Sequence, residues 1–168
     1  MKQGHKIVAT VYIETSIISY LVSRPSMHLV TLARQHLTKQ WWDKRRHEHT
    51  LFSSQFVVDE AARGDSVYAT KRLAALNETT LLGIEAEIPE LANEIVARSI
   101  LPPTASLDAL HISTAAYHAI EYLLTWNCKH IANARIVPRI YRVFEELGYQ
   151  SPLICTIEEM MGDDNPLE

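Results

Sequence analysis

The sequence has little glycine, little cysteine and no long apolar run, and each shortage narrows the choice of fold. Only 5 of its 168 residues are glycine, which argues against a turn-rich all-β protein. The 2 cysteines, Cys128 and Cys155, need no disulfide framework in a domain of this size and fit a reducing cytosol, although a pairing between them stays open. No apolar run approaches the ~18–20 residues that a transmembrane helix needs, so we expect no membrane span.

Export and nucleotide binding also lack their usual sequence signals. Lys2 and Lys6 precede an apolar run over residues 7–13, which resembles the start of a signal peptide. Glu14 interrupts that run, and no clean small-residue cleavage pattern follows, so we expect a buried strand and a cytoplasmic protein. The chain contains neither a Gly-rich dinucleotide fingerprint nor a P-loop.

The net charge of −4 argues at first against a nucleic-acid partner, but the charge is unevenly distributed. Residues 158–168 contain five acidic residues and no basic residue. The rest of the chain therefore has 15 acidic and 16 basic residues, which is a net charge of +1. A local basic segment matters more than the total charge for nucleic-acid binding.

Such a basic segment follows two tryptophans. Trp41 continues the apolar face of a predicted helix, so we expect it in the core, whereas Trp42 points elsewhere and is the better candidate for an interface. Lys44, Arg45 and Arg46 follow directly. Aromatic rings beside bases suit contact with RNA or with a protein partner, and a solvated basic helix end is the simpler alternative.

Apolar patterning predicts strands that alternate with helices. The predicted strands cover residues 8–13, 50–53, 80–84, 122–125 and 153–156, and the predicted helices cover about residues 16–21, 27–46, 55–63, 66–76, 89–99, 106–119 and 135–147. Thr156 and Glu159 have capping-box spacing for a last helical turn. This alternation predicts an α/β fold, a three-layer α/β/α sandwich with a central, mostly parallel sheet.

Four polar residues stand out against this pattern. Glu14 follows the first predicted strand, where open α/β sheets bind ligands, and Asn127 follows the fourth. Glu60 lies in the helix after the second strand, and Asp108 lies near the start of its helix. Each has a simpler explanation on its own: Asp108 as a helix-dipole partner, Glu60 as a solvated helix residue and Asn127 as an N-cap.

Together and in this order, the polar residues and their neighbours resemble the PIN-domain nucleases, especially the VapC-type toxins of toxin–antitoxin pairs. The resemblance covers about residues 8–161 and implies a PIN-like domain over residues 1–162. The acidic residues 163–168 lie at the chain terminus, and we expect them to form a disordered tail. The segments that carry it are Tyr12-Ile13-Glu14-Thr15-Ser16, Val57-Val58-Asp59-Glu60-Ala61, Asp108-Ala109-Leu110-His111-Ile112 and Leu124-Thr125-Trp126-Asn127.

The resemblance implies a metal-dependent endoribonuclease. In it Glu14, Glu60 and Asp108 bind Mg²⁺ or Mn²⁺, and Asn127 occupies a fourth catalytic position. It also implies RNA as the substrate, an antitoxin protein as a partner, and a homodimer. Mg²⁺ prefers oxygen ligands, and a bound cation both polarises a phosphate and acidifies a water, so no serine, histidine or cysteine nucleophile is needed.

Supporting residues surround these positions. The resemblance places the hydroxyls of Thr15, Ser16 and Thr125 beside the acids. His111 lies one helical turn after Asp108, so it either orients that acid or is an ordinary core histidine. The other histidine pairs lack partners at zinc-finger spacing, and we do not favour a zinc site.

Two departures from the commonest family pattern keep a second function open. Glu14 and Asn127 both stand where many members have Asp, and an amide can offer a metal only a neutral oxygen. The alternative is therefore a PIN fold with attenuated catalysis that binds RNA or a protein partner.

Overall fold

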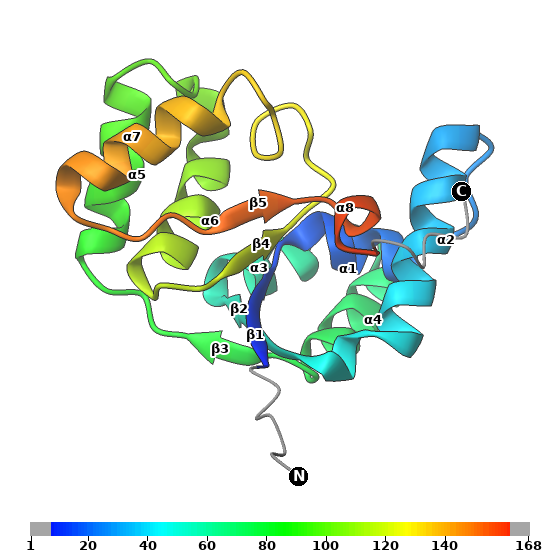
Figure 1. Ribbon diagram of the computed structural model, residues 1–168. Helices are drawn as coiled ribbons and strands as arrows, with labels where there is room; N and C mark the ends of the chain where they lie inside the picture. Colours follow the sequence, from blue (N-terminus) through cyan, green and yellow to red (C-terminus); the bar gives the residue numbers. More distant parts are fainter. Residues whose placement is uncertain (1–7, 162–168) are drawn as a thin grey trace, which may run out of the picture.

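A five-stranded parallel sheet forms the centre of the protein (Figure 1). The structure is a computed structural model and describes residues 8–161, so the predicted acidic tail lies outside the described residues. All four strand pairings are parallel, in the order β3-β2-β1-β4-β5, which confirms the predicted mostly parallel sheet. The strands are β1 (Ala9–Ile13), β2 (His49–Ser54), β3 (Thr80–Leu82), β4 (Tyr122–Leu124) and β5 (Leu153–Cys155).

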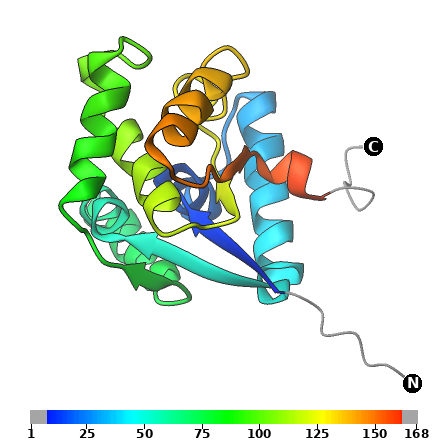
Figure 2. The same ribbon diagram turned by 60° about the vertical axis from the view of Figure 1, so that its left-hand side comes forward.

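Helices cover both faces of this sheet, which gives the predicted three layers (Figures 1 and 2). One layer contains α1 (Thr15–Val22), α2 (Leu29–Lys44), α3 (Gln55–Ala61) and α4 (Ser66–Leu76). The opposite layer contains α5 (Glu87–Ala97), α6 (Ser106–Tyr117) and α7 (Val137–Leu147), while the short α8 (Ile157–Met161) packs against α2. Parallel strands need crossover connections, and right-handed crossovers place helices on opposite faces when the strand order reverses.

That reversal occurs between β1 and β4. The chain leaves β1 into α1 and α2 on one face, and it leaves β4 towards α7 on the other. The carboxyl ends of the two strands therefore border the crevice in which α/β sheets bind ligands. A backbone hydrogen bond from Glu14 N–H to the Leu124 carbonyl, 3.1 Å long, holds the two strand ends together at this point.

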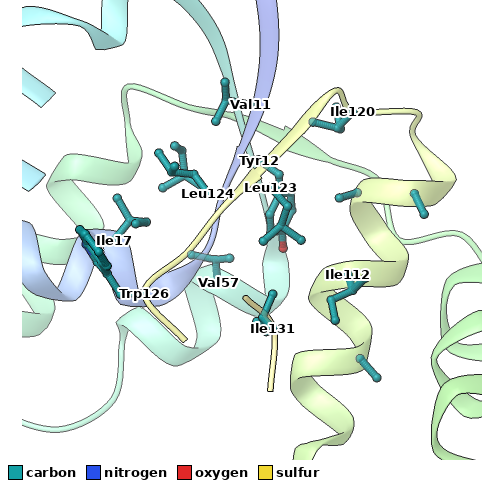
Figure 3. Packing of buried hydrophobic residues seen from close by; sticks show 14 of the residues in the cluster. Val11, Tyr12, Ile17, Val57, Ile112, Ile120, Leu123, Leu124, Trp126 and Ile131 are labelled. Atoms are coloured by element: carbon teal, nitrogen blue, oxygen red, sulfur yellow. The ribbon is translucent and has the colours of Figure 1, made fainter. Parts of the chain in front are cut away.

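The two central strands are covered on both faces. Val11, Tyr12 and Ile13 of β1 and Leu123 and Leu124 of β4 are each 0% exposed. This near-continuous apolar pattern is typical of parallel strands between two helical layers. Figure 3 shows these strands packed between apolar side chains of neighbouring helices. The core thus fixes the strand ends on which the polar residues stand.

Most predicted elements are present, with ends that differ by a few residues. The predicted capping box is confirmed, because Thr156 N–H donates to Glu159 Oε2 over 2.7 Å and Glu159 N–H donates back to Thr156 Oγ1 over 3.4 Å. The first helix, which apolar patterning predicts from about residue 16 with Ser16 as its N-cap, begins instead at Thr15. Its N-cap is Glu14, whose carboxylate accepts from Ser16 N–H. A longer acidic side chain can reach back to this amide as Ser or Asp does.

The prediction that Trp42 is exposed is also wrong. Trp42 is 7% exposed and belongs to the apolar core together with Trp41, whose ring centroid lies 6.4 Å away. The Arg46 guanidinium covers the Trp42 ring at 5.6 Å from its centroid. Because α1, α8 and the 3₁₀ turn η1 (Arg46–Glu48) all contact α2, a wider part of its surface is buried than its apolar spacing predicts.

Trp42→Leu is therefore expected to lower the free energy of unfolding by about 1–3 kcal/mol, because a buried ring is replaced by a smaller side chain. Urea denaturation of both proteins measures this loss. Sedimentation at several concentrations checks the association state, which should not change. A variant of unchanged stability and weakened self-association would restore Trp42 as an interface residue.

Candidate metal-binding site

Glu14 stands at the carboxyl end of β1 and is held rigidly by neighbouring groups. Its side chain is 5% exposed. Its Oε2 accepts three hydrogen bonds: from Ser16 Oγ (2.5 Å), from Ser16 N–H (3.1 Å) and from Thr125 Oγ1 (2.6 Å). Thr125 follows β4, so this carboxylate ties together the ends of the two central strands. The N-terminus of α1 adds a favourable positive dipole end for the carboxylate.

Glu60 reaches the same place from α3. Its Oε2 accepts hydrogen bonds from Thr15 Oγ1 over 2.5 Å and lies 2.7 Å from His111 Nε2. His111 belongs to α6, on the opposite helical layer. The pair therefore joins the two layers beyond the carboxyl edge of the sheet, where α3 and α6 contact each other.

His111 is almost fully buried and continues into a chain of hydrogen bonds. It is 1% exposed, and its Nδ1 lies 2.9 Å from the hydroxyl of Tyr12 in β1. That hydroxyl lies 2.7 Å from Ser54 Oγ, and Tyr12 and Ser54 are both 0% exposed. Burial raises the pKa of Tyr12, so its hydroxyl stays protonated and can both donate and accept.

Asp108 and Asn127 form a second pair beside the first. Asn127 Nδ2 donates to Asp108 Oδ1 over 2.9 Å, and Asn127 Oδ1 accepts from His130 N–H over 3.0 Å. Asn127 is thus a cap of the following turn and a partner of Asp108 at the same time. These contacts confirm the predicted cap, because the amide oxygen accepts while the amide nitrogen donates to Asp108. A part of Asn127 in a metal site stays a prediction.

Burial and neighbouring groups shift the pKa values of Asp108 and Glu60 in opposite directions. Burial raises the pKa of Asp108, and the Glu14 carboxylate raises it further. Burial also raises the pKa of Glu60, but hydrogen bonds from His111 and Thr15 outweigh that effect and leave its pKa below the usual value. A bound cation would relieve the repulsion that acts on Asp108.

Each of the three carboxylates keeps one oxygen that accepts no hydrogen bond from the described residues. Within residues 8–161, all hydrogen bonds to the carboxylates of Glu14 and Glu60 fall on Oε2, and the hydrogen bond to the carboxylate of Asp108 falls on Oδ1. Glu14, Glu60 and His111 offer ligand atoms that all lie within 4.8 Å of one another. Oxygen and imidazole donors at this spacing fit a divalent cation.

The structure thus brings Glu14, Glu60 and His111 within ligand distance of one another, and Asp108 lies outside that group but close enough for the Glu14 charge to contribute to its raised pKa. The structure also shows two residues that sequence reasoning missed. Ser54 ends β2 as a polar residue, so the argument that selected Glu14 at the end of β1 could have found it. Tyr12 carried no such signal, because an aromatic residue inside an apolar strand is normally part of the core. Only its contact with His111 distinguishes it.

The basic segment lies elsewhere. Lys44 ends α2, Arg45 follows it, and Arg46 begins the turn η1, which leads into β2. The first residue of β2, His49, pairs with Ala9 at the start of β1. The three basic residues therefore stand near the amino edge of the sheet, opposite Glu14. Arg45 pairs with Glu48 and Arg46 with Glu78. A contact between this segment and a partner stays a prediction, separate from the acidic site.

No helix in the described part of the chain is long and apolar enough to cross a membrane. No family model matches the sequence, and no curated protein sequence matches it. The fold is similar to a chain in the crystal structure of VapBC2 from Rickettsia felis bound to a DNA fragment from their promoter. The match has a TM-score of 0.50 and 14% sequence identity, and it covers 88% of this chain and 98% of that one. With its 3-2-1-4-5 parallel sheet between two helical layers, this chain has the PIN-like α/β fold that its motifs predicted.

Proposed function

We propose that this protein is a metal-dependent endoribonuclease that cleaves RNA phosphodiesters and serves as the toxin of a toxin–antitoxin pair. The observation that supports the proposal is the approach of Glu14 and Glu60 at the point where the strand order reverses, with Asp108 close enough for the Glu14 charge to contribute to its raised pKa. Within the described residues, one oxygen of each of these carboxylates accepts no hydrogen bond. Three segments that are distant in the chain supply these acids, and the mutual repulsion of neighbouring carboxylates costs stability unless a cation binds between them.

In this proposal Glu14, Glu60 and Asp108 hold Mg²⁺ or Mn²⁺, which suits their oxygen donors. The ion supplies polarisation of the scissile phosphate and an acidified water. Thr15, Ser16 and Thr125 hold two of the carboxylates in fixed orientations through their hydroxyls. Such fixed ligands need little reorganisation when the substrate arrives.

Positive groups near the acids support a phosphate-bearing substrate. Arg63 is close enough to lower the pKa of Glu60, and His130 is close enough to act on Asp108 in the same direction. Arg63 lies two residues after the end of α3, and His130 lies in the turn between β4 and α7. A phosphate at the site would therefore meet the Arg63 guanidinium as well as the ion.

A protein partner is supported by an exposed apolar surface on another part of the domain. Met27, Leu29 and Val30, around the start of α2, are 96%, 82% and 66% exposed. Clustered apolar side chains of this kind mark surfaces that bind proteins. Because the similar structure is a VapBC2 complex, we propose an antitoxin as this partner, and we keep a homodimer as a prediction.

The test is cleavage of a long single-stranded RNA by the purified protein, followed on denaturing gels. We expect cleavage with Mg²⁺ or Mn²⁺, loss of cleavage in excess chelator, and recovery when the ion is restored. Cleavage that persists in chelator would contradict the proposal. Binding of metal and RNA without any cleavage would favour the alternative, a PIN fold retained as a binding module.

A further inference from the structure

The proposed nuclease function does not explain the chain of hydrogen bonds that runs from Glu60 through His111 and Tyr12 to Ser54. Holding Glu60 in place needs only the Thr15 hydroxyl and the His111 N–H. Nevertheless this chain contains three buried polar side chains: His111 is 1% exposed, and Tyr12 and Ser54 are each 0% exposed. Buried polar groups are costly unless they are paired, so such a line calls for a purpose.

We propose that His111 binds the metal directly through Nε2, that Tyr12 and Ser54 are positioning residues for it, and that the site consequently prefers a first-row transition-metal ion to Mg²⁺. This inference rests on the metal site of the proposed function and names one of its ligands.

The first support is geometric. His111 Nε2, rather than Nδ1, faces the acids, and it lies in the group whose ligand atoms are all within 4.8 Å of one another. Asp108 is on the same helix one turn earlier, so α6 presents an acid and an imidazole on one face. The imidazole therefore stands among the ligands and not behind them.

The second support is the partner of the other ring nitrogen. Histidines that bind metals nearly always donate their second N–H to an oxygen, which fixes the tautomer and the ring orientation. The Tyr12 hydroxyl stands 2.9 Å from Nδ1 and can accept this N–H while donating to Ser54 Oγ at 2.7 Å. The same chain also serves the metal-free protein: with a proton on Nε2 facing Glu60, Nδ1 accepts from Tyr12, and Ser54 donates to Tyr12. Both tautomers thus leave no ring nitrogen unpaired.

The choice of ion follows from ligand chemistry. Mg²⁺ takes oxygen ligands in a strict octahedron, whereas imidazole nitrogen favours the transition metals. A site made of two or three carboxylates alone should bind Mg²⁺ and Mn²⁺ with more similar affinities. A site that includes a preoriented imidazole should bind Mn²⁺ more tightly, and the metals later in the first row more tightly still.

Mn²⁺ is the probe for the experiment, because it is paramagnetic. We expect Mn²⁺ to bind the metal-free full-length protein at least about tenfold more tightly than Mg²⁺ in calorimetric titrations. We expect His111→Gln to weaken Mn²⁺ binding by about 10- to 100-fold and Mg²⁺ binding by less than about threefold. We expect Tyr12→Phe to weaken Mn²⁺ binding by about tenfold. Pulsed electron paramagnetic resonance should detect ¹⁴N coupled to Mn²⁺ in the natural protein and not in His111→Gln.

Two matched variants control for damage to the fold. His118→Gln makes the same change at the end of α6, where the ring contacts the Gly83 carbonyl at 2.9 Å, and Tyr141→Phe removes another phenol hydroxyl, which accepts from Ile154 N–H. Neither should alter metal affinity. If His111→Gln does not fold, the ¹⁴N signal of the natural protein decides the question.

The outcomes separate this inference from the function on which it rests. Equal affinities for Mn²⁺ and Mg²⁺ without a ¹⁴N signal would overturn the direct role of His111 and leave the carboxylate site in place. Equal losses for both ions in His111→Gln would do the same, because a residue that only orients Glu60 affects every ion alike. Failure of the natural protein to bind either ion would overturn both proposals.

Discussion

Replacing Asp108 by Asn is expected to lower the rate of RNA cleavage by about 1000-fold, or about 4 kcal/mol of transition-state stabilisation. The change removes a charged ligand oxygen at the proposed site, and an amide offers the ion only a neutral one. The fold should survive, because Asn can still accept the hydrogen bond that Asp108 Oδ1 receives from Asn127. It should even gain stability in the absence of metal, since burial and the repulsion from Glu14, which raise the pKa of Asp108, both act against a charged side chain that Asn does not have.

Cleavage assays on Asp108→Asn need a matched control, and Asp59→Asn provides it. Asp59 directly precedes Glu60 but is exposed and bonded to Gln55 within α3. Its replacement should leave cleavage within about twofold, as expected of a surface change away from the site. Circular dichroism must show that both variants fold. Cleavage by folded Asp108→Asn at the natural rate would mean that another site does the chemistry.

Asn127→Asp is expected to act in opposite directions on the metal-free and metal-bound protein. The new carboxylate can still accept from His130 N–H, so the cap survives. It cannot donate to Asp108, however, and two carboxylates would then face each other where one hydrogen bond of 2.9 Å now stands. We expect the free energy of unfolding without metal to fall by about 1–3 kcal/mol. We expect Mn²⁺ binding to tighten about tenfold, or about 1.4 kcal/mol, and cleavage to accelerate.

Calorimetric titration and thermal unfolding of both proteins, at one pH and one salt concentration, measure these two effects. Asn133→Asp is the matched control, because Asn133 caps the same loop through bonds to Arg135 N–H and the Lys129 carbonyl. It should leave metal affinity unchanged. If Asn127→Asp has the metal affinity and the metal-free melting temperature of the natural protein, Asn127 is a cap alone and has no part in the site.

Whether Asn127 belongs to the metal site or is a cap alone bears on the choice between an active nuclease and a binding module with attenuated catalysis. Asn127 uses its donor on Asp108 and its acceptor on His130 N–H, so it stabilises the empty site. A fourth acid in its place would attract a cation more strongly but would leave the empty site crowded. At position 127, Asp is therefore expected to increase metal affinity, whereas Asn is expected to increase the stability of the metal-free protein.

The sequence by itself determined the layers and the parallel sheet, and it predicted which acids form the site. Strands buried on both faces appear as continuous apolar runs, as in β1 and β4, and their alternation with helices admits few arrangements. The rule that ligands bind at the carboxyl ends of such strands then pointed to Glu14 and Asn127 before any contact was known. These signals are local or follow from chain connectivity, which is why the sequence carries them.

The tertiary structure alone decided which side chains meet. Glu60 and His111 come from opposite helical layers, and their 2.7 Å contact depends on how α3 and α6 cross beyond the sheet edge. The Tyr12 hydroxyl became relevant only through that contact. Likewise the burial of Trp42 depends on the elements that pack around α2. Apolar periodicity describes one element at a time, so it cannot report distances of a few ångström between residues that are far apart in the chain.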